Sequence, residues 1–492
     1  MRGHGSRHAD RFKFFQQRGF SSTVINPVLT STGLKTLSSR ADPGTKRGEK
    51  LDKIESIAAR ISRLRPARYF GRVEEIRAGL VRVCGLNAHA SIGDRVLLSR
   101  ELDLTGEIVA LGATTAEILP ESPVNGLSIG TEVELTFAPR LAPCAAWIGR
   151  IVDPFGRPLD GRPLPHGSEE RSFSAAAPAA VTRKRLGSRL DTGLAVFDTL
   201  LPIVRGQRIG LFAGSGVGKS TLLSNLSRGV QADLVVIALI GERGRELREF
   251  VENVLGPEGM ARAVVVAATS DQSPLIRRRC AWAAMAVAEY FRDHGRHVLF
   301  LADSITRFAE AHREIALASG ESPSYRGFPP STSHLIMSLA ERAGPGPEGG
   351  GDITGIFSVL VAGSDMEEPI ADILRGVLDG HVVLDRAIAE RGRFPAVDVL
   401  RSVSRSLPHA ATDAENALIG RARAALGAYA ESELMIKAGL YAAGSDPKLD
   451  EAVKLYPALD AFVARNSPDG AAASFAMLAN ALHLPRGGNQ RS

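Results

Sequence analysis

The chain has 492 residues, 44% of them hydrophobic, which is long enough for two or three domains with cores of their own. Its formal net charge is +6, but residues 1–50 hold ten Lys and Arg against three Asp and Glu, so the remaining chain is close to neutral. This charge balance argues against a folded nucleic-acid-binding domain, and no run of about 18 apolar residues predicts a membrane-spanning helix.

Residues 1–50 form a basic arm that matches no pattern of a folded domain. The arm is Arg-rich and contains Ser, and it superficially resembles an organellar transit peptide. We favour a disordered extension, or a start codon placed too early, over a transit peptide.

Residues 51–66 are predicted to form one amphipathic helix that ends at Pro66. Charged residues lie opposite a stripe of apolar residues at helical spacing, namely Leu51, Ile54, Ile57 or Ala58, Ile61 and Leu64. The helix either packs against its own domain or docks a partner protein, and the pattern leaves both interpretations open.

Residues 67–140 change character, because short Val-, Ile- and Leu-rich runs alternate with Gly and Pro. Closely spaced short strands of this kind predict a small β-barrel domain. Residues 141–188 are rich in Pro and Gly and are interpreted as a connecting segment.

Residues 189–409 alternate apolar strand candidates with helical stretches, which predicts a parallel α/β sheet. The strand candidates are "RIGLFA", "DLVVIALI", "AVVVAAT", "HVLFLAD" and "GIFSVLVA". In residues 410–492 helix-forming residues dominate, which predicts a C-terminal helical domain. The expected fold class is therefore α/β, with a small N-terminal β-barrel and a C-terminal helical domain.

The first strand of the α/β region runs into "AGSGVGKST", which fits a phosphate-binding loop between a strand and a helix. Glycines allow the backbone amides to surround phosphate groups, Lys219 would meet the β and γ oxygens, and Ser220 would offer its hydroxyl to Mg²⁺. The residues predicted to bind the nucleotide here are Gly214, Ser215, Gly216, Val217, Gly218, Lys219, Ser220 and Thr221.

Acidic residues follow two further apolar strands. Asp303 ends "HVLFLAD" and is predicted to hold Mg²⁺, directly or through water, although an acid there can also cap the next helix. The string "GERGRE" follows "DLVVIALI", and ligands bind at the carboxyl ends of parallel strands. We therefore predict Glu242 as the general base or water-orienting residue, Arg243 as a phosphate contact, and Glu246 as support for the metal or the base.

Several long stretches of the sequence, beyond the short motifs above, resemble one protein family. From about Gly71 to about Leu482 the sequence resembles the flagellar and type III secretion export ATPases, which are relatives of the catalytic subunit of the rotary ATP synthase. The resemblance rests on "LDTGLAVFDTLLPIVRGQRIGLFAGSGVGKST", "GERGRE", "LADSITRFAEAHREIALASGE", "DMEEPIADILRGVLDGHVVLDRAIAERGRFPAVDVLRSVSR" and "GSDPKLDEAV". It implies a RecA-like P-loop domain and a Mg²⁺-dependent ATPase, with ATP and Mg²⁺ bound.

The resemblance also assigns individual residues. It implies that Glu242 is catalytic, that Arg307 lies near the nucleotide, and that Phe394 stacks on adenine. Arg405, in "SVSR", is similar to the arginine finger that reaches the ATP of a neighbouring subunit. Phe394 stands where relatives usually have Tyr, so the stacking face is kept and a hydroxyl is lost.

The resemblance further implies a homohexamer that powers or regulates export of flagellar proteins. The expected partners are a stator-like regulatory protein at the N-terminal helix, membrane proteins of the export gate, export chaperones and export substrates, with no nucleic acid. The expected location is cytoplasmic, peripheral at the inner membrane at the base of the flagellum. Three widely spaced cysteines, Cys84, Cys144 and Cys280, also suit a reducing compartment.

Three alternatives remain at this point. The ATPase of a virulence-type injectisome shares the motifs and is the leading alternative. A non-catalytic subunit of a rotary ATP synthase is less favoured, because Glu242 is the residue that such relatives replace. A hexameric nucleic-acid translocase is disfavoured because residues 69–137 contain only Tyr69, Phe70 and Phe137 as aromatic residues.

Overall fold

The computed structural model describes residues 67–77, 79–361 and 366–483. The predictions for the arm at 1–50 and for the helix at 51–66 lie outside the described residues. Within the described ranges, none of the helices combines the length and the apolar character needed to cross a membrane.

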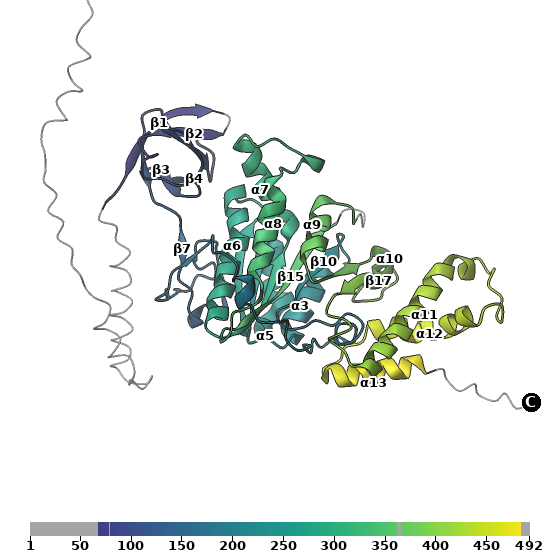
Figure 1. Cartoon of the computed structure of the whole chain (residues 1–492). Coiled ribbons are helices and arrows are strands. Elements are labelled where there is room, and N and C mark those ends of the chain that lie inside the picture. The colour runs from purple at the N-terminus through teal and green to yellow at the C-terminus, as the bar shows by residue number, and fades with distance from the viewer. Residues whose placement is uncertain (1–66, 78, 362–365, 484–492) are drawn as a thin grey trace, which may run out of the picture. The chain divides into compact units, whose positions relative to one another are not determined.

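Six antiparallel strands close into a small barrel in the order β1-β2-β5-β4-β3-β6 (Figure 1). Their inward side chains, such as Val81, Val83 and Ile108, are fully buried and fill the barrel interior. The predicted N-terminal barrel is therefore confirmed. Its strands are β1 (Phe70–Arg77), β2 (Leu80–Cys84), β3 (Arg95–Ser99), β4 (Leu104–Leu111), β5 (Thr115–Pro120) and β6 (Glu132–Leu135).

A nine-stranded, mostly parallel sheet forms the centre of the α/β region, in the order β17-β16-β10-β15-β13-β11-β12-β8, with β14 paired to β15. The β16–β17 and β14–β15 pairs are antiparallel. The strands are β8 (Arg150–Val152), β10 (Arg208–Ala213), β11 (Leu234–Glu242), β12 (Ala263–Thr269), β13 (His297–Asp303), β14 (Gly344–Pro345), β15 (Asp352–Leu360), β16 (Gly380–Leu384) and β17 (Val397–Ser404). The predicted parallel sheet is confirmed.

Both faces of this sheet are covered by helices, which explains why its strands lack polar alternation. Along β11, Val235, Ile237 and Leu239 belong to a core that includes α3 (Lys219–Gly229). The intervening residues, such as Val236, belong to a second core that includes α6 (Pro274–Asp293). Alternate side chains of one strand thus enter two separate cores.

The segment at 141–188, interpreted from the sequence as a connecting segment, contains short strands. Its strand β8 pairs in parallel with β12 and extends the central sheet, with Val264 beside Arg150. Two further short strands, β7 (Arg140–Leu141) and β9 (Arg171–Ser172), pair with each other. Strands of two or three residues carry too little periodicity to be recognised in a Pro- and Gly-rich sequence.

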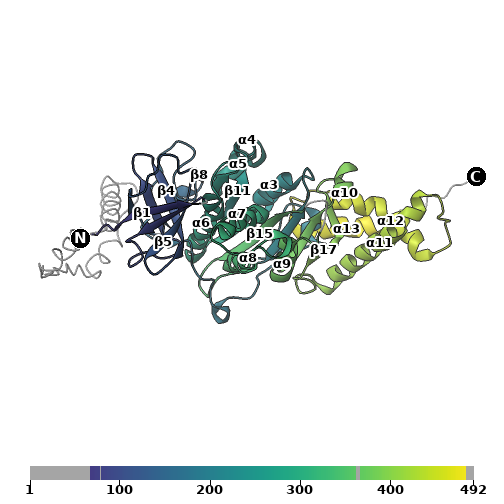
Figure 2. The same cartoon turned by 90° about the horizontal axis from the view of Figure 1, so that it is seen from above.

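The helices α11, α12 and α13 make up the C-terminal region and confirm the predicted helical domain (Figure 2). Thr412 and Glu415 form a capping box at the start of α11, which satisfies backbone amides that have no partner within the helix. The remaining helix bounds are α2 (Ala195–Asp198), α4 (Gly244–Glu249), α5 (Gly256–Ala261), α7 (Ile305–Ala318), α8 (Ser331–Arg342), α9 (Pro369–Val377), α10 (Arg386–Glu390), α11 (Asp413–Lys437), α12 (Pro447–Val463) and α13 (Gly470–Leu482), with a π-helical turn at Phe250–Leu255.

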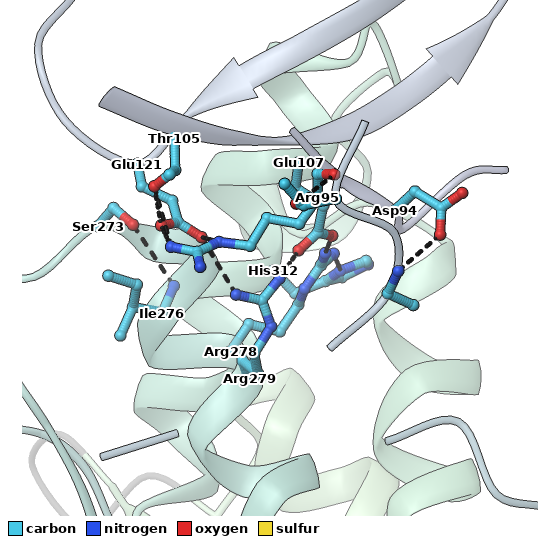
Figure 3. A network of polar contacts seen from close by, with 12 residues as sticks. Asp94, Arg95, Thr105, Glu107, Glu121, Ser273, Ile276, Arg278, Arg279 and His312 are labelled. Carbon is cyan, nitrogen blue, oxygen red and sulfur yellow. Dashed lines mark hydrogen bonds and ion pairs between the residues drawn. The ribbon is translucent and has the colours of Figure 1, made fainter. Parts of the chain in front are cut away.

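A buried network of charges joins the barrel to α6 (Figure 3). Glu107, on β4, accepts hydrogen bonds from Arg279 and, at 2.7 Å, from Arg278. Glu121 accepts from Arg279 at 3.2 Å and also pairs with Arg95. Glu107 and Arg279 are almost fully buried, so their charges depend on each other.

Candidate nucleotide-binding site

Several predicted site residues, together with Ser358, gather at the carboxyl edge of four neighbouring strands. In the order β10-β15-β13-β11, these strands carry the phosphate loop, Ser358, Asp303 and Glu242. The register places Leu301 of β13 between Ile237 of β11 and Ile356 of β15. This edge is where open parallel sheets bind ligands.

The phosphate loop joins β10 directly to α3. Gly216 and Gly218 have φ angles of 77° and 85°, which are left-handed and favour glycine. Val217 is buried and anchors the loop in the core, whereas Ser215, Gly216, Ser220 and Thr221 are exposed. The loop thus presents an open, polar surface at the N-terminus of an 11-residue helix, where backbone amides can bind phosphate.

Lys219 and Asp303 form an ion pair beside this loop. The hydroxyl of Ser358 donates a hydrogen bond of 2.7 Å to the same oxygen, Oδ1, of Asp303. Asp303 is only 4% exposed, so its carboxylate depends on these two partners for stabilisation. The ammonium group of Lys219 and a buried carboxylate thus lie side by side next to a phosphate-binding loop.

These residues fit a Mg²⁺ ion that is bound together with phosphate. Mg²⁺ prefers hard oxygen ligands and usually combines one or two protein groups with phosphate oxygens and water. The Asp303 carboxylate and the exposed Ser220 hydroxyl are such groups. Across the described ranges, no three His, Cys, Asp or Glu side chains gather into a metal-ligand cluster, so the protein alone supplies no complete set here.

Glu242 ends β11, where its side chain is partly buried. Burial raises its pKa to about 7, the negative charge of Asp303 adds to the rise, and Lys219 opposes it. Glu242 also shares a hydrogen bond with Glu246. Burial tends to raise the pKa of Glu246, but hydrogen bonds to Glu242 and Arg243 lower it overall. A carboxyl with a pKa near neutrality is suited to accept a proton from water.

The two other arginines predicted near this edge each pair with a glutamate. Arg243 is exposed and pairs with Glu246 at 3.0 Å. Arg307, on α7, pairs with Glu310 at 2.9 Å. Its side chain lies close to Gly241: a Cβ added to that glycine would be 3.4 Å from the Cβ of Arg307. Arg307 is therefore a neighbour of the Glu242 backbone, and neither arginine is shown in contact with the phosphate loop.

Phe394 lies over the phosphate loop. A Cβ added to Gly218 would come within 3.1 Å of its ring, and half of the Phe394 side chain is exposed. The ring is thus held against the loop on one side and open to solvent on the other. This arrangement leaves an aromatic face for a planar group bound beside the loop.

Arg405 lies at the opposite edge of the sheet from the phosphate loop. Its backbone amide donates to the carbonyl of Asp379, whose own amide donates to Arg208 at the start of β10. The phosphate loop begins after Ala213 at the other end of β10, and five residues of strand span about 16 Å. The side chain of Arg405 is exposed and donates to the carbonyl of Arg375. It is not brought together with Lys219 or Glu242 of its own chain.

Ser358 is the functional candidate that the sequence interpretation missed. It is the only hydroxyl residue in the apolar strand candidate "GIFSVLVA". A polar residue in a strand covered on both faces needs a buried hydrogen-bond partner, and this requirement was the available signal. The identity of the partner depends on strand order, which the string does not contain.

Two protein-family models match the chain. Residues 193–404 match the nucleotide-binding domain of the ATP synthase alpha/beta family, and residues 411–482 match the C-terminal domain of the type III secretion ATPase EscN. The two matched ranges coincide with most of the central sheet and with the C-terminal helices.

Curated relatives and solved structures extend over most of the chain. The flagellum-specific ATP synthase of Caulobacter vibrioides is 44% identical, over 87% of this chain and 99% of the relative. The type 3 secretion system ATPase of Xanthomonas euvesicatoria is 40% identical, over 83% of this chain and 93% of the relative. Two solved structures show the assembled ATPase EscN of enteropathogenic E. coli, one of them in complex with its central stalk EscO. The EscN sequence in both is 35% identical to this chain, and the TM-scores are 0.77 and 0.76. Each match covers 84% of this chain and 100% of the EscN chain.

Proposed function

Because this chain belongs to the family of flagellum-specific ATP synthases and type III secretion ATPases, we propose that it hydrolyses ATP with Mg²⁺ at the site built around Lys219, Asp303 and Glu242. Membership of the family makes the chain an export ATPase that binds nucleotide. The assignment of roles to individual residues is our proposal. It rests on the four neighbouring strands that end at one edge of the sheet.

Binding of ATP is assigned to the phosphate loop and to Phe394. The loop amides and the N-terminus of α3 hold the phosphates, and Lys219 moves from Asp303 to the β and γ oxygens. Adenine stacks on the exposed face of Phe394. Ser220 and Asp303 would hold Mg²⁺, and the ion would supply positive charge to the phosphate oxygens.

Water activation is assigned to Glu242, and its position carries this role: it ends β11, next to β13 with Asp303, at the edge of the sheet where the phosphate loop begins. A carboxyl with a pKa of about 7 is largely ionised just above neutral pH, yet remains basic enough to take a proton from the attacking water. Glu246, whose own pKa is lowered, accepts a hydrogen bond from protonated Glu242 and so stabilises the proton on Glu242. Arg243, which pairs with Glu246, and Arg307, which lies against Gly241, are placed beside the end of β11 and are proposed to contact the bound nucleotide.

The active form is proposed to be a homohexamer in which Arg405 serves the site of a neighbouring copy. Arg405 is exposed and lies at the edge of the sheet remote from its own phosphate loop, so a second chain is needed to bring it to ATP. EscN, a structural relative, is described as assembled, which supports self-association of this chain. An arginine supplied in trans stabilises charge on the transferred phosphoryl group.

The proposed biological role is export of flagellar proteins. The 44% identical Caulobacter relative is a flagellum-specific ATP synthase, and its alignment covers nearly its whole length. EscN binds a central stalk, EscO, which supports a regulatory partner for this chain as well. A stator-like protein at residues 51–66, export-gate proteins, chaperones and substrates remain proposed partners, with a peripheral position at the inner membrane.

The virulence-type injectisome is retained as the second candidate because the Xanthomonas relative is 40% identical. Complementation separates the two roles. Expressed in a strain that lacks its flagellar ATPase, the chain should restore swimming, and the Glu242→Gln variant should not. Export restored only in a strain that lacks the ATPase of an injectisome would transfer the assignment to the second candidate.

A further inference from the structure

We propose that Ser358 is a positioning residue for the reaction: its hydroxyl orients the carboxylate of Asp303 and keeps it in place for Mg²⁺ while ATP is bound. This inference rests on the proposed function, in which Asp303 holds the metal. It adds a residue that the motifs do not contain, on β15, between the phosphate loop of β10 and the metal-holding acid of β13.

The contact between the two side chains is short and fully enclosed. Ser358 is 0% exposed and its hydroxyl donates to Oδ1 of Asp303 at 2.7 Å. The strands β13 and β15 are paired in parallel, with Ala302 beside Phe357, so the next residue of each strand is Asp303 and Ser358. The hydrogen bond therefore connects neighbouring positions of two rigid strands, and it fixes the direction of the carboxylate as well as its charge.

Lys219 gives this hydrogen bond a specific function. In the structure Lys219 and Ser358 both contact Oδ1 of Asp303. When Lys219 moves to the phosphates, it withdraws a positive charge from a carboxylate that is only 4% exposed. The donor on Ser358 stays with the strand, so it continues to hold Oδ1 and leaves the other carboxylate oxygen directed to the metal.

A group that supports a metal ligand changes metal affinity about 10- to 100-fold when it is removed. We expect the Ser358→Ala variant to lie near the lower limit, because Asp303 itself is retained. Nucleotide binding in the absence of Mg²⁺ should be unchanged, and the Mg²⁺ concentration that gives half of the Mg²⁺-dependent gain in affinity should rise about tenfold. Ser358→Thr keeps a hydroxyl at the same position and should restore the parent value.

The test is equilibrium binding of a fluorescent, non-hydrolysable ATP analogue to the full chain, first in EDTA and then with increasing Mg²⁺. Thr354→Val provides the matched control, because Thr354 is also fully buried on β15 but bonds to Gly206 and His297. This control should lower thermal stability and leave the Mg²⁺ dependence unchanged. If Ser358→Ala does not fold, Ser358→Cys, which has a weak donor of similar size, replaces it and should give an intermediate shift.

The Asp303→Asn variant separates the two possible failures. If it removes the Mg²⁺-dependent gain while Ser358→Ala behaves like the parent, the role of Ser358 is wrong and the metal role of Asp303 stands. If Asp303→Asn retains the gain, the metal role in the proposed function is wrong as well. A loss of affinity in Ser358→Ala that is equal in EDTA and in Mg²⁺ would also overturn the positioning role, since it would reflect general damage to the site.

Discussion

Replacing Glu107 by Gln is expected to lower the free energy of local opening of β4 in the barrel by about 3 kcal/mol. Glu107 contacts both Arg278 and Arg279, and one such charge pair is worth about 4 kcal/mol at an effective dielectric constant near 20. Breaking a buried pair costs roughly 3–5 kcal/mol, because the remaining charge stays buried without compensation. We expect the lower limit of this range, because both arginines keep another partner. Arg279 still pairs with Glu121, and the guanidinium of Arg278 lies over the ring of Trp282.

The assay is hydrogen exchange of the backbone amides of β4 in the native chain, which gives the free energy of local opening. Glu75→Gln is the matched control on the same barrel, because Glu75 and its partner Arg82 are both more than one-third exposed. Such a surface pair is worth at most about 1 kcal/mol. If Glu107→Gln lowered the opening free energy of β4 by no more than the control does, the buried network would not be what holds the barrel to α6.

Lys219→Ala should weaken ATP binding, which equilibrium binding measures. Glu242→Gln should keep ATP binding and lose turnover by a factor of about 10² or more, which steady-state hydrolysis measures. Turnover at the parent rate in Glu242→Gln would disprove the role of Glu242. The kcat/KM of the parent should rise about tenfold per pH unit below pH 7 and level off above it, because the base acts when deprotonated; a flat profile from pH 5.5 to 8 would contradict the raised pKa of Glu242. Burial lowers the pKa of His297 to about 4 in the folded chain, whereas its value in the unfolded chain is near 6.5. Between these pH values the unfolded chain binds more protons than the folded chain. The free energy of unfolding should therefore fall by up to about 3 kcal/mol as the pH drops from 6.5 to 4. Urea unfolding at several pH values tests this, and His297→Gln should show a shallower dependence.

The sequence predicted the central strands well, because a strand covered on both faces is an unbroken apolar run. "AVVVAAT" and "HVLFLAD" coincide with β12 and β13 residue for residue. The phosphate loop was also found, since its glycines and Lys219 occupy fixed positions along the chain. The roles given to the individual site residues, and the domain boundaries, stay predictions.

Contacts between segments far apart in the sequence could not be predicted in the same way. The hydrogen bond between Ser358 and Asp303 requires the strand order, and the contact between Glu107 and Arg279 joins residues 172 positions apart. The three-residue strand β8 lies in a stretch that the sequence predicts to be a connector, because its place in the sheet is decided by pairing with β12. Local periodicity records which faces are buried, but not which elements meet.

The central claim is that one ATP site is built from two copies of the chain, and mixing two inactive variants tests it most directly. Lys219→Ala damages the phosphate loop and leaves Arg405 intact, whereas Arg405→Ala does the opposite. In a mixed ring, an intact loop can meet the intact Arg405 of a neighbour, so we predict that ATPase activity reappears on mixing and that the parent rate per chain rises with protein concentration. Full activity of an isolated parent monomer, or no recovery from mixed rings, would contradict the shared site.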